Sequence, residues 1–276
     1  MARKSIFLWV MAMMLWASGP LRASAADSMM LATTTSTDNT GLMDVLAPQF
    51  KKDTGIELKW TAIGTGKALE MGKNCDVDVL LVHAPAAEKK YVADGFGKDR
   101  TLVMYNDFVI IGPKNDPAGL KDATVRQAMG KLAAGNATFV SRGDNSGTHK
   151  KEISLWKKTG NDAPDKEKWY IQTGQGMIAT INVATEKGAY TMTDRGTFIK
   201  FADNHVGNPP LVVLVEGDPE LFNQYSLIAI NPAKCKNVKY DLVKKLTDWM
   251  TSKAVQKRIG NFKLLNKKLF IPNARR

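Results

Sequence analysis

Short apolar runs alternate with amphipathic stretches along most of the chain, which is the pattern of an α/β protein. The stretch VDVLLVH at 77–83 is almost continuously apolar, as expected of a strand covered on both faces. Between 41 and 52, Leu42, Leu46 and Phe50 recur at helical spacing, and Gly55 stands just beyond, where a helix would end. These two stretches predict a buried strand and an amphipathic helix.

The same alternation continues to the C-terminus without a low-complexity linker or a repeat of fixed period. Further strands are expected at 28–36, 56–63, 107–113, 137–141 and 224–232, and further helices at 65–73, 86–95, 125–135, 149–160 and 240–260. If the chain forms two lobes, it must therefore pass between them without a flexible joint.

The first 25 residues have the three parts of a secretory signal peptide. Arg3 and Lys4 are followed by a dozen apolar residues at 6–17, too few to span a bilayer, and then by Ala23-Ser24-Ala25. We expect export to the periplasm with cleavage near Ala25. An uncleaved N-terminal membrane anchor is the alternative, but the apolar run is short and ends at Gly19-Pro20.

Composition is that of a globular protein, with 44% hydrophobic and 24% charged residues. The formal charge is +12, and losing Arg3, Lys4 and Arg22, with no acidic residue in 1–25, leaves 12 − 3 = +9. A basic chain attracts anions. Export and the scattered placement of most basic residues, the tail from Lys263 to Arg276 excepted, argue against nucleic acid as a partner.

Three polar turns, each between an expected strand and an expected helix, share one chemistry. They are TTTSTDNTG at 33–41, IGTGK at 63–67 and SRGDNSGTH at 141–149, all rich in hydroxyl groups and glycine. Unpaired N–H groups and the helix dipole make a helix start a site for an anion. Helix capping by Ser, Thr, Asp and Asn explains any one of them. Three such turns, one with an arginine, favour anion binding.

A serine hydrolase is the alternative from another class, since GDNSG at 143–147 superficially resembles a nucleophile turn. The motif is not G-x-S-x-G, and Ser146 would need a histidine and an acid held beside it. His149 is too close in sequence for the usual arrangement, and nothing marks His83 as a partner. The three histidines lie far apart, so no metal-ligand spacing is present.

Cys75 and Cys235 are the two cysteines of the chain. An oxidising compartment would let them pair, but the sequence does not show whether their Cα atoms come within reach of each other. At this point a disulfide and two free thiols both stay open.

Six stretches taken together resemble the tungstate-binding TupA family, the substrate-binding subunits of tungstate ABC importers. They stand in the expected order and cover essentially the whole chain after residue 25: TTTST, VHAPAAE, VMYNDFVIIGP, SRGDNSGTHKKE, MTDRGTF and NQYSLIAINP. SRGDNSGT alone resembles the oxyanion turn of periplasmic phosphate-binding proteins, in which arginine, serine, glycine and threonine contact the anion.

The resemblance implies a type II periplasmic-binding-protein fold, with two α/β lobes joined by two crossover segments that close on the ligand. The crossovers are expected near 105–107 and 223–231. Lobe one then holds 26–106 and 231–276, and lobe two holds 107–230. This topology puts both cysteines on lobe one, so we predict that they form a disulfide.

By position, the resemblance also implies the ligand-binding residues. From lobe one these are Thr34, Thr35 and Ser36, with Thr65 a weaker candidate, and from lobe two Arg142, Ser146, Gly147 and Thr148. Asp144 is expected to orient Arg142. Supporting roles without ligand contact are assigned to Asp194, Arg195 and His83.

Tungstate and molybdate suit such a site, because these fully ionised dianions need only donors, whereas hydrogen phosphate also needs an acceptor for its proton. The tungstate assignment itself comes from the resemblance. It implies a receptor that is not an enzyme, has no cofactor, and delivers its anion to a membrane permease subunit. A phosphate or sulfate receptor of the same fold is a further alternative.

Overall fold

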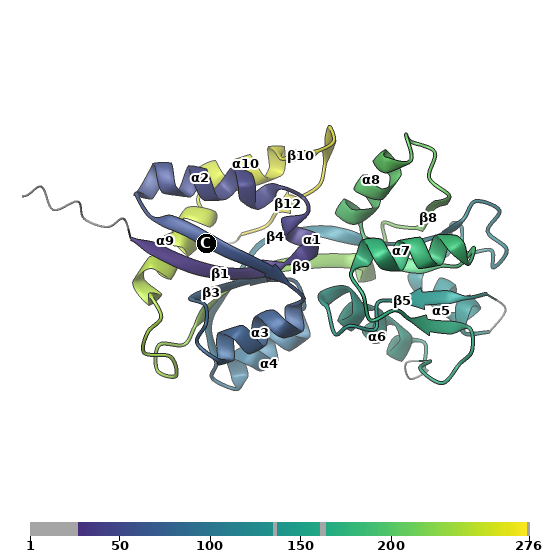
Figure 1. The fold of residues 1–276 in the computed structure, drawn as a ribbon, viewed down its shortest axis with the longest axis horizontal. Helices are drawn as coiled ribbons and strands as arrows, with labels where there is room; N and C mark the ends of the chain where they lie inside the picture. Colours follow the sequence, from purple (N-terminus) through teal and green to yellow (C-terminus); the bar gives the residue numbers. More distant parts are fainter. Residues whose placement is uncertain (1–26, 135–136, 161–163, 275–276) are drawn as a thin grey trace, which may run out of the picture.

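The computed structural model describes residues 27–134, 137–160 and 164–274, which form two lobes side by side along the long axis of the molecule (Figure 1). Both lobes combine a sheet with helices, so the two-lobe α/β fold expected from the resemblance is confirmed. The expected signal peptide at 1–25 lies outside the described residues.

Lobe one is built on a mixed sheet whose strand order is β12-β4-β9-β3-β1-β2. Its strands are β1 (Ser28–Thr34), β2 (Glu57–Ile63), β3 (Val79–Val82), β4 (Gly97–Pro113), β9 (Phe222–Ile230) and β12 (Ile271–Pro272). β1 pairs in parallel with β2 and β3, while β9 is antiparallel to both β3 and β4. Because these three strands run in the same direction, the turns that follow β1, β2 and β3 lie at the same end of the sheet, beyond the C-terminal ends of the strands.

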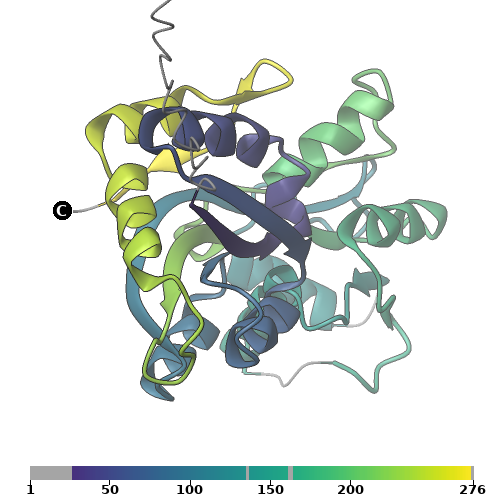
Figure 2. The ribbon, with the colours of Figure 1, turned by 60° about the vertical axis from the view of Figure 1, so that its left-hand side comes forward.

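Helices cover both faces of this sheet (Figures 1 and 2). One face packs on α2 (Leu42–Thr54), α9 (Tyr240–Met250) and α10 (Lys253–Asn261), and the other on α3 (Thr65–Lys73) and α4 (Pro85–Ala93). Neighbouring residues of β1 lie on opposite faces of the sheet: Leu31 packs in the apolar core on the α2 side and Ala32 in the core on the α3 side. This alternation explains why the strands are apolar throughout. The short helix α1 (Thr35–Asp38) follows β1, and a small hairpin, β10 (Lys263–Leu264) and β11 (Lys267–Lys268), follows α10.

Lobe two uses the second half of β4, which pairs with β7 (Thr191–Asp194) and β8 (Leu211–Val215). The short parallel pair β5 (Phe139–Ser141) and β6 (Tyr170–Gln172) is joined to this region by a bridge between Phe139 and Tyr190. Two apolar cores flank these strands. The first contains residues of α5 (Val125–Ala133), α6 (Gly147–Lys158) and the single turn η1 (Pro219–Leu221), and the second residues of α7 (Met177–Glu186) and α8 (Arg195–Asn204).

The chain passes between the lobes in β4 and just before β9. The partner of β4 changes from β9 at Asp107 to β7 at Phe108, which agrees with the first expected crossover. The second expectation was wrong, because residues 223–230 pair with β3 and β4 in the sheet of lobe one. Lobe two therefore ends near Phe222, not at 230. An apolar strand fits either sheet, so its sequence did not reveal its lobe.

Most expected elements appear with small changes at their ends. α2 ends where Gly55 adopts a left-handed conformation, with φ of 76°. The long helical pattern at 240–260 is two helices, because Ser252 caps α10 by accepting a hydrogen bond from the Val255 N–H. β4 begins ten residues before the expected strand at 107–113, in a polar stretch starting at Gly97.

Cys75 and Cys235 form a disulfide, with their Cα atoms 5.4 Å apart. The bond joins the segment after α3 to the segment after β9, both in lobe one, so the predicted pairing is confirmed. Within the described ranges, no helix is both long enough and apolar enough to cross a membrane.

Candidate functional site

Polar residues at four helix starts are buried where the two lobes meet. α1 and α3 contribute from lobe one, and α6 and α8 from lobe two. Each follows a strand of its own lobe, so the N-terminal ends of these helices point into the space between the lobes (Figure 1). The buried polar residues of these turns are Thr34, Ser36, Thr37, Thr65, Arg142, Ser146, Thr148, Asp194 and Thr197.

The lobe-one turn is a set of mutually bonded hydroxyl groups. Thr34 caps α1, and its Oγ1 lies 2.7 Å from Thr37 Oγ1 and 3.1 Å from Ser36 Oγ. His83, at the end of β3, places Nε2 3.1 Å from Thr34 Oγ1 and 3.4 Å from Ser36 Oγ. Thr35 is the exposed member of this turn. The structure thus joins two of the expected residues, Thr34 and Ser36, in one set with Thr37, and His83 lies within hydrogen-bond distance of both expected residues.

His83 is neutral at physiological pH. Its ring is 3% exposed and packs beside Phe108 and Tyr225. Burial lowers the pKa of His83 to about 4, and the positive charge of Arg142 acts in the same direction. A neutral imidazole can donate from one nitrogen and accept at the other. His83 can therefore orient the hydroxyls without adding charge.

The lobe-two turn holds an almost fully buried arginine. Arg142 donates from Nη2 to Asp144 Oδ2 over 2.5 Å and from Nε to the Gln175 carbonyl over 3.3 Å. The second oxygen of Asp144 accepts from the Ser146 N–H at 3.1 Å. Asp144 therefore ties Arg142 to the start of α6, and its role in orienting Arg142 toward a ligand stays a prediction.

At the start of α6, Ser146 is the N-cap and accepts a hydrogen bond from the His149 N–H. The next residue, Gly147, contacts lobe one: a Cβ atom placed on it would lie 3.0 Å from Thr65 Oγ1. Thr65 and Thr148 are almost completely buried, yet their hydroxyl groups have no hydrogen-bond partner within the described part of the chain. Unpaired buried hydroxyls are costly unless a ligand uses them.

Asp194 and Arg195 have different surroundings. Asp194 caps α8 by accepting bonds from the N–H and hydroxyl of Thr197 at 2.9 and 2.7 Å. Burial raises the pKa of Asp194, while the Thr197 bonds and the charge of Arg142 oppose this. Arg195 instead pairs with Asp107 and Glu216, and lines a cavity of about 520 Å³ with residues of both crossovers. Arg195 therefore binds the chain at Asp107, where β4 passes between the lobes. For Asp194 and Arg195 alike, a supporting role toward a ligand stays a prediction.

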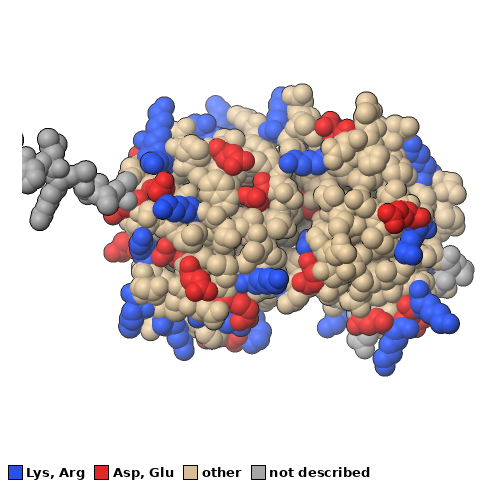
Figure 3. Space-filling model, in the orientation of Figure 1, with Lys and Arg blue, Asp and Glu red and all other residues tan. Residues whose placement is uncertain are grey.

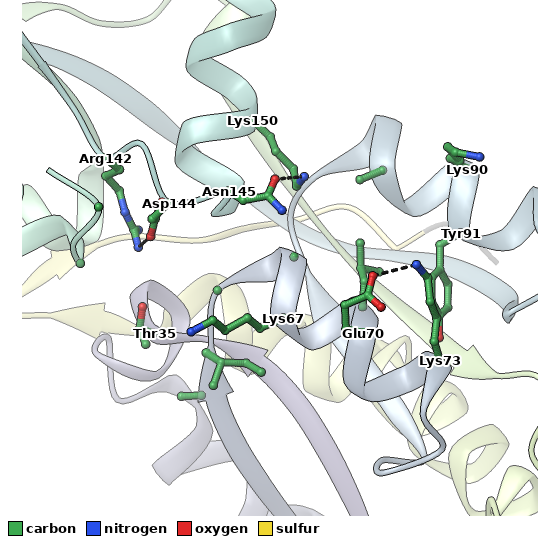
Figure 4. A pocket seen from close by; sticks show the side chains of 18 of the residues that line it. Thr35, Lys67, Glu70, Lys73, Lys90, Tyr91, Arg142, Asp144, Asn145 and Lys150 are labelled. Atoms are coloured by element: carbon green, nitrogen blue, oxygen red, sulfur yellow. Dashed lines mark hydrogen bonds and ion pairs between the residues drawn. The ribbon is translucent and has the colours of Figure 1, made fainter. Parts of the chain in front are cut away.

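A larger cavity of about 660 Å³ opens at the mouth of the cleft (Figure 4). Residues of both lobes line it, among them Thr35, Lys67, Arg142, Asp144, Asn145 and Lys150. Arg142 and Asp144 point toward one another at one side of this space, opposite Thr35 and Lys67. Of the buried donors named above, Arg142 lines this cavity.

Several residues of this region were not among those predicted from the sequence. Lys67 and Asn145 lie inside the turns that were singled out, so the motifs could have indicated them. The Gln175 carbonyl is 33 residues from Arg142, and its contact depends on how the loop before α7 folds. Thr37 belongs to the quoted TTTST stretch but was not selected.

The geometry of a serine nucleophile is not present among the described residues. Ser146 Oγ accepts from a backbone N–H, His149 Nδ1 accepts from the Asn145 N–H, and His83 Nε2 bonds Thr34 and Ser36. No imidazole there hydrogen-bonds Ser146 Oγ. The same ranges hold no group of three His, Cys, Asp or Glu residues that could bind a metal ion.

Lys and Arg side chains are interspersed with Asp and Glu over both lobes on the face seen in Figure 3. No basic stripe crosses this face. The guanidinium of Arg142, in contrast, is buried between the lobes.

The chain is similar to known proteins over most of its length. A family model described as a PBP superfamily domain matches residues 21–254. The chain is 51% identical over 240 residues to a tungstate-binding protein TupA of Campylobacter jejuni, covering 87% of this chain and 89% of the relative.

Two solved structures are also similar. A tungstate-binding protein TupA from Desulfovibrio alaskensis G20 is 68% identical, with a TM-score of 0.82 over 91% of this chain and 100% of the other. A tungstate ABC transporter structure from Geobacter sulfurreducens is 49% identical, with a TM-score of 0.76 over 86% of this chain and 100% of the other.

Proposed function

Because the chain belongs to the TupA family of the PBP superfamily, we propose that it captures tungstate between its lobes and delivers it to an ABC importer. Molybdate is a second candidate ligand, since it has the same charge and geometry. The residues proposed to bind the anion are Thr34, Thr35, Ser36, Thr65, Arg142, Ser146, Gly147 and Thr148.

One observation carries the proposal: two buried hydroxyls that have no hydrogen-bond partner among the described residues, those of Thr65 from lobe one and Thr148 from lobe two, lie on opposite sides of the lobe boundary. Arg142 supplies the positive charge on the same boundary, 5% exposed. A charge-assisted hydrogen bond contributes about 1.5–3 kcal/mol, roughly twice a neutral one. Buried hydrogen-bond donors on both lobes, together with the positive charge of Arg142, suit an anion that is held when the two lobes close on it.

The donor set favours a fully ionised oxyanion over hydrogen phosphate. A protonated phosphate needs an acceptor, and the carboxylates of two buried or half-buried residues of these turns already accept bonds, Asp144 from Arg142 and the Ser146 N–H, and Asp194 from Thr197. Tungstate and molybdate need donors alone. Rejection of the smaller sulfate would come from the size of the closed space.

The family supports a proposal for the partner and the compartment. A receptor of this kind serves a membrane permease subunit, and the proposed location is the periplasm, after cleavage near Ala25. The disulfide between Cys75 and Cys235 supports an oxidising compartment. Expression with the full N-terminus, followed by cell fractionation and N-terminal sequencing, tests location and cleavage together.

Calorimetric titration of the purified protein with tungstate, molybdate, sulfate and phosphate tests the ligand. Tight binding of tungstate, with sulfate and phosphate much weaker, is expected. Preference for phosphate or sulfate would assign the alternative receptor. Covalent labelling of Ser146 by a fluorophosphonate probe would contradict a receptor without catalysis and favour the hydrolase.

A further inference from the structure

Three glycines in the first turns of helices lie so close to the opposite lobe that a Cβ atom added to them would be 2.6 to 3.2 Å from the nearest atoms there. They are Gly66 of α3, Gly147 of α6 and Gly196 of α8. These helices come from both lobes, so the contacts run in both directions across the cleft.

Gly147 makes the tightest contact with a rigid neighbour. A Cβ atom at this position would lie 2.6 Å from Cε1 and 2.9 Å from Nδ1 of His83. The His83 ring cannot swing away, because it is buried between Phe108 and Tyr225 and bonded to Thr34. A methyl group at 147 therefore fits only if the lobes move apart.

Gly196 and Gly66 make the same kind of contact against softer neighbours. A Cβ atom at Gly196 would lie 3.2 Å from side-chain carbons of Thr40 and Leu269 in lobe one. One at Gly66 would lie 2.7 Å from the side-chain nitrogen of Asn145 in lobe two, whose amide can rotate, and 3.1 Å from the backbone oxygen of the same residue. Beside Gly196, Ile199 of α8 packs into the core of lobe one, which places the start of α8 against that lobe.

Backbone conformation does not explain these glycines. None of the three has a positive φ, so alanine could adopt the same backbone angles. Glycine also weakens a helix relative to alanine. What glycine provides here is space between the lobes.

We propose that Gly147, with Gly196 and Gly66 beside it, is the stop that sets how far the lobes close and hence the size of the space around the anion. This inference rests on the proposed function. Gly147 carries the main effect, because its neighbour is a fixed ring. Donors on separate lobes reach one tetrahedral anion only when the two lobes are a defined distance apart. A larger residue at Gly147 would keep the lobes further apart and would weaken the hydrogen bonds from both lobes to the anion at the same time.

The test compares Gly147→Ala, Gly196→Ala and two matched controls. Gly130→Ala, inside α5, and Gly176→Ala, just before α7, add the same methyl where nothing lies within 4 Å; Gly176 lines the cavity at the cleft mouth, so Gly130→Ala, outside that cavity, is the decisive control. Tungstate titration of the wild type comes first. If the wild type binds none of tungstate, molybdate, sulfate and phosphate, the proposed function itself fails, whatever the glycine variants show.

Given wild-type binding, Gly147→Ala is expected to raise the tungstate Kd roughly ten- to a hundred-fold, the range that overpacking produces. Gly196→Ala is expected to raise it less, by up to about ten-fold, because its contacts are longer. Dissociation should become faster while association changes little. Small-angle scattering of bound Gly147→Ala should give a larger radius of gyration than the bound wild type.

The melting temperature without ligand separates this effect from misfolding. Alanine favours a helix, so unliganded Gly147→Ala should melt no lower than the wild type. Wild-type affinity and an unchanged bound radius in Gly147→Ala would overturn the proposal. A loss of affinity of the same size in Gly176→Ala and Gly130→Ala would overturn it as well.

Discussion

Arg142 and Asp144 are joined by a hydrogen bond of 2.5 Å, with side chains only 6% and 18% exposed. The pair is therefore not an ordinary surface ion pair, whose contribution is about 0–1 kcal/mol. The bonds of Arg142 to other described residues use Nε and Nη2. A guanidinium has five N–H donors, so donors remain for an anion in the cleft.

Replacing Arg142 by alanine should weaken tungstate binding by roughly ten- to a hundred-fold or more, because a charge-assisted bond of about 1.5–3 kcal/mol is lost. Arg142→Lys keeps the charge but loses the planar fork, so it should bind less tightly than the wild type and discriminate less among tungstate, molybdate and sulfate. Calorimetry on the wild type and both variants measures this.

Circular dichroism of each arginine variant serves as the control for folding. Affinities within a factor of two of the wild type for all three anions would show that Arg142 does not face the ligand.

Glu152 makes the stability of lobe two depend on pH. This carboxyl group of α6 is 2% exposed and accepts bonds from Ser141 Oγ, Trp156 Nε1 and Tyr170 OH at 2.6, 2.9 and 2.6 Å. Burial raises the pKa of Glu152 from 4.5 to about 7. The folded state then holds this proton more tightly than the unfolded state, so stability falls as pH rises from about 4.5 to about 7.

Glu152→Gln imitates the protonated carboxyl and lacks this titration. The free energy of unfolding of the wild type, minus that of the variant, should fall by on the order of 3 kcal/mol across the window. Denaturant unfolding at several pH values measures both proteins. Glu88 and Asp194, whose pKa values burial also raises, are common to both and cancel in the difference. A difference that stays constant with pH would contradict the prediction.

Features that depend on a few consecutive residues could be predicted from the sequence. The turns at Thr34–Ser36 and Arg142–Thr148 are visible because strand, donor-rich turn and helix start follow one another along the chain. The pairing of Arg142 with Asp144 is local as well. Contact of these residues with a ligand stays a prediction.

Features that depend on how distant segments meet could not be predicted. Arg195 reaches Asp107, 88 positions away, only once β7 has paired with β4. The contact of Gly147 with His83 exists only between two folded lobes. The mistaken lobe for β9 has the same origin, because an apolar strand does not specify its neighbours.

The disulfide should contribute to stability and not to ligand binding. It closes a loop of sequence separation 160, and Cys75 follows the far end of α3, whose first turn faces the cleft. Replacing both cysteines by alanine should lower the free energy of unfolding by about 2–5 kcal/mol. Denaturant unfolding and tungstate calorimetry on the same sample separate the two effects.

Thiol counting under denaturing, non-reducing conditions shows whether protein taken from the periplasm carries the bond. Two free thiols per chain would contradict the disulfide there. A large loss of tungstate affinity in a folded double variant would show that the bond also holds the site.

Lys67 should speed the arrival of the anion. It lies in the first turn of α3, where the helix dipole disfavours a cation, so its position costs some helix stability. It is exposed, has no ion-pair partner in the described ranges, and lines the cavity at the cleft mouth with Arg142 (Figure 4). A cation at the entrance of a cleft raises the local concentration of an anionic ligand.

Lys67→Gln should therefore lower the association rate for tungstate several-fold at low ionic strength and change dissociation little. The difference from the wild type should shrink as salt rises and the screening length falls below about 10 Å. Stopped-flow measurement over a salt series gives both rates. Lys187→Gln removes the same charge at the exposed end of α7, outside the cavity, and should associate at the wild-type rate. Equal slowing in both variants would assign the effect to net charge, and no slowing in Lys67→Gln would remove this residue from the entry path.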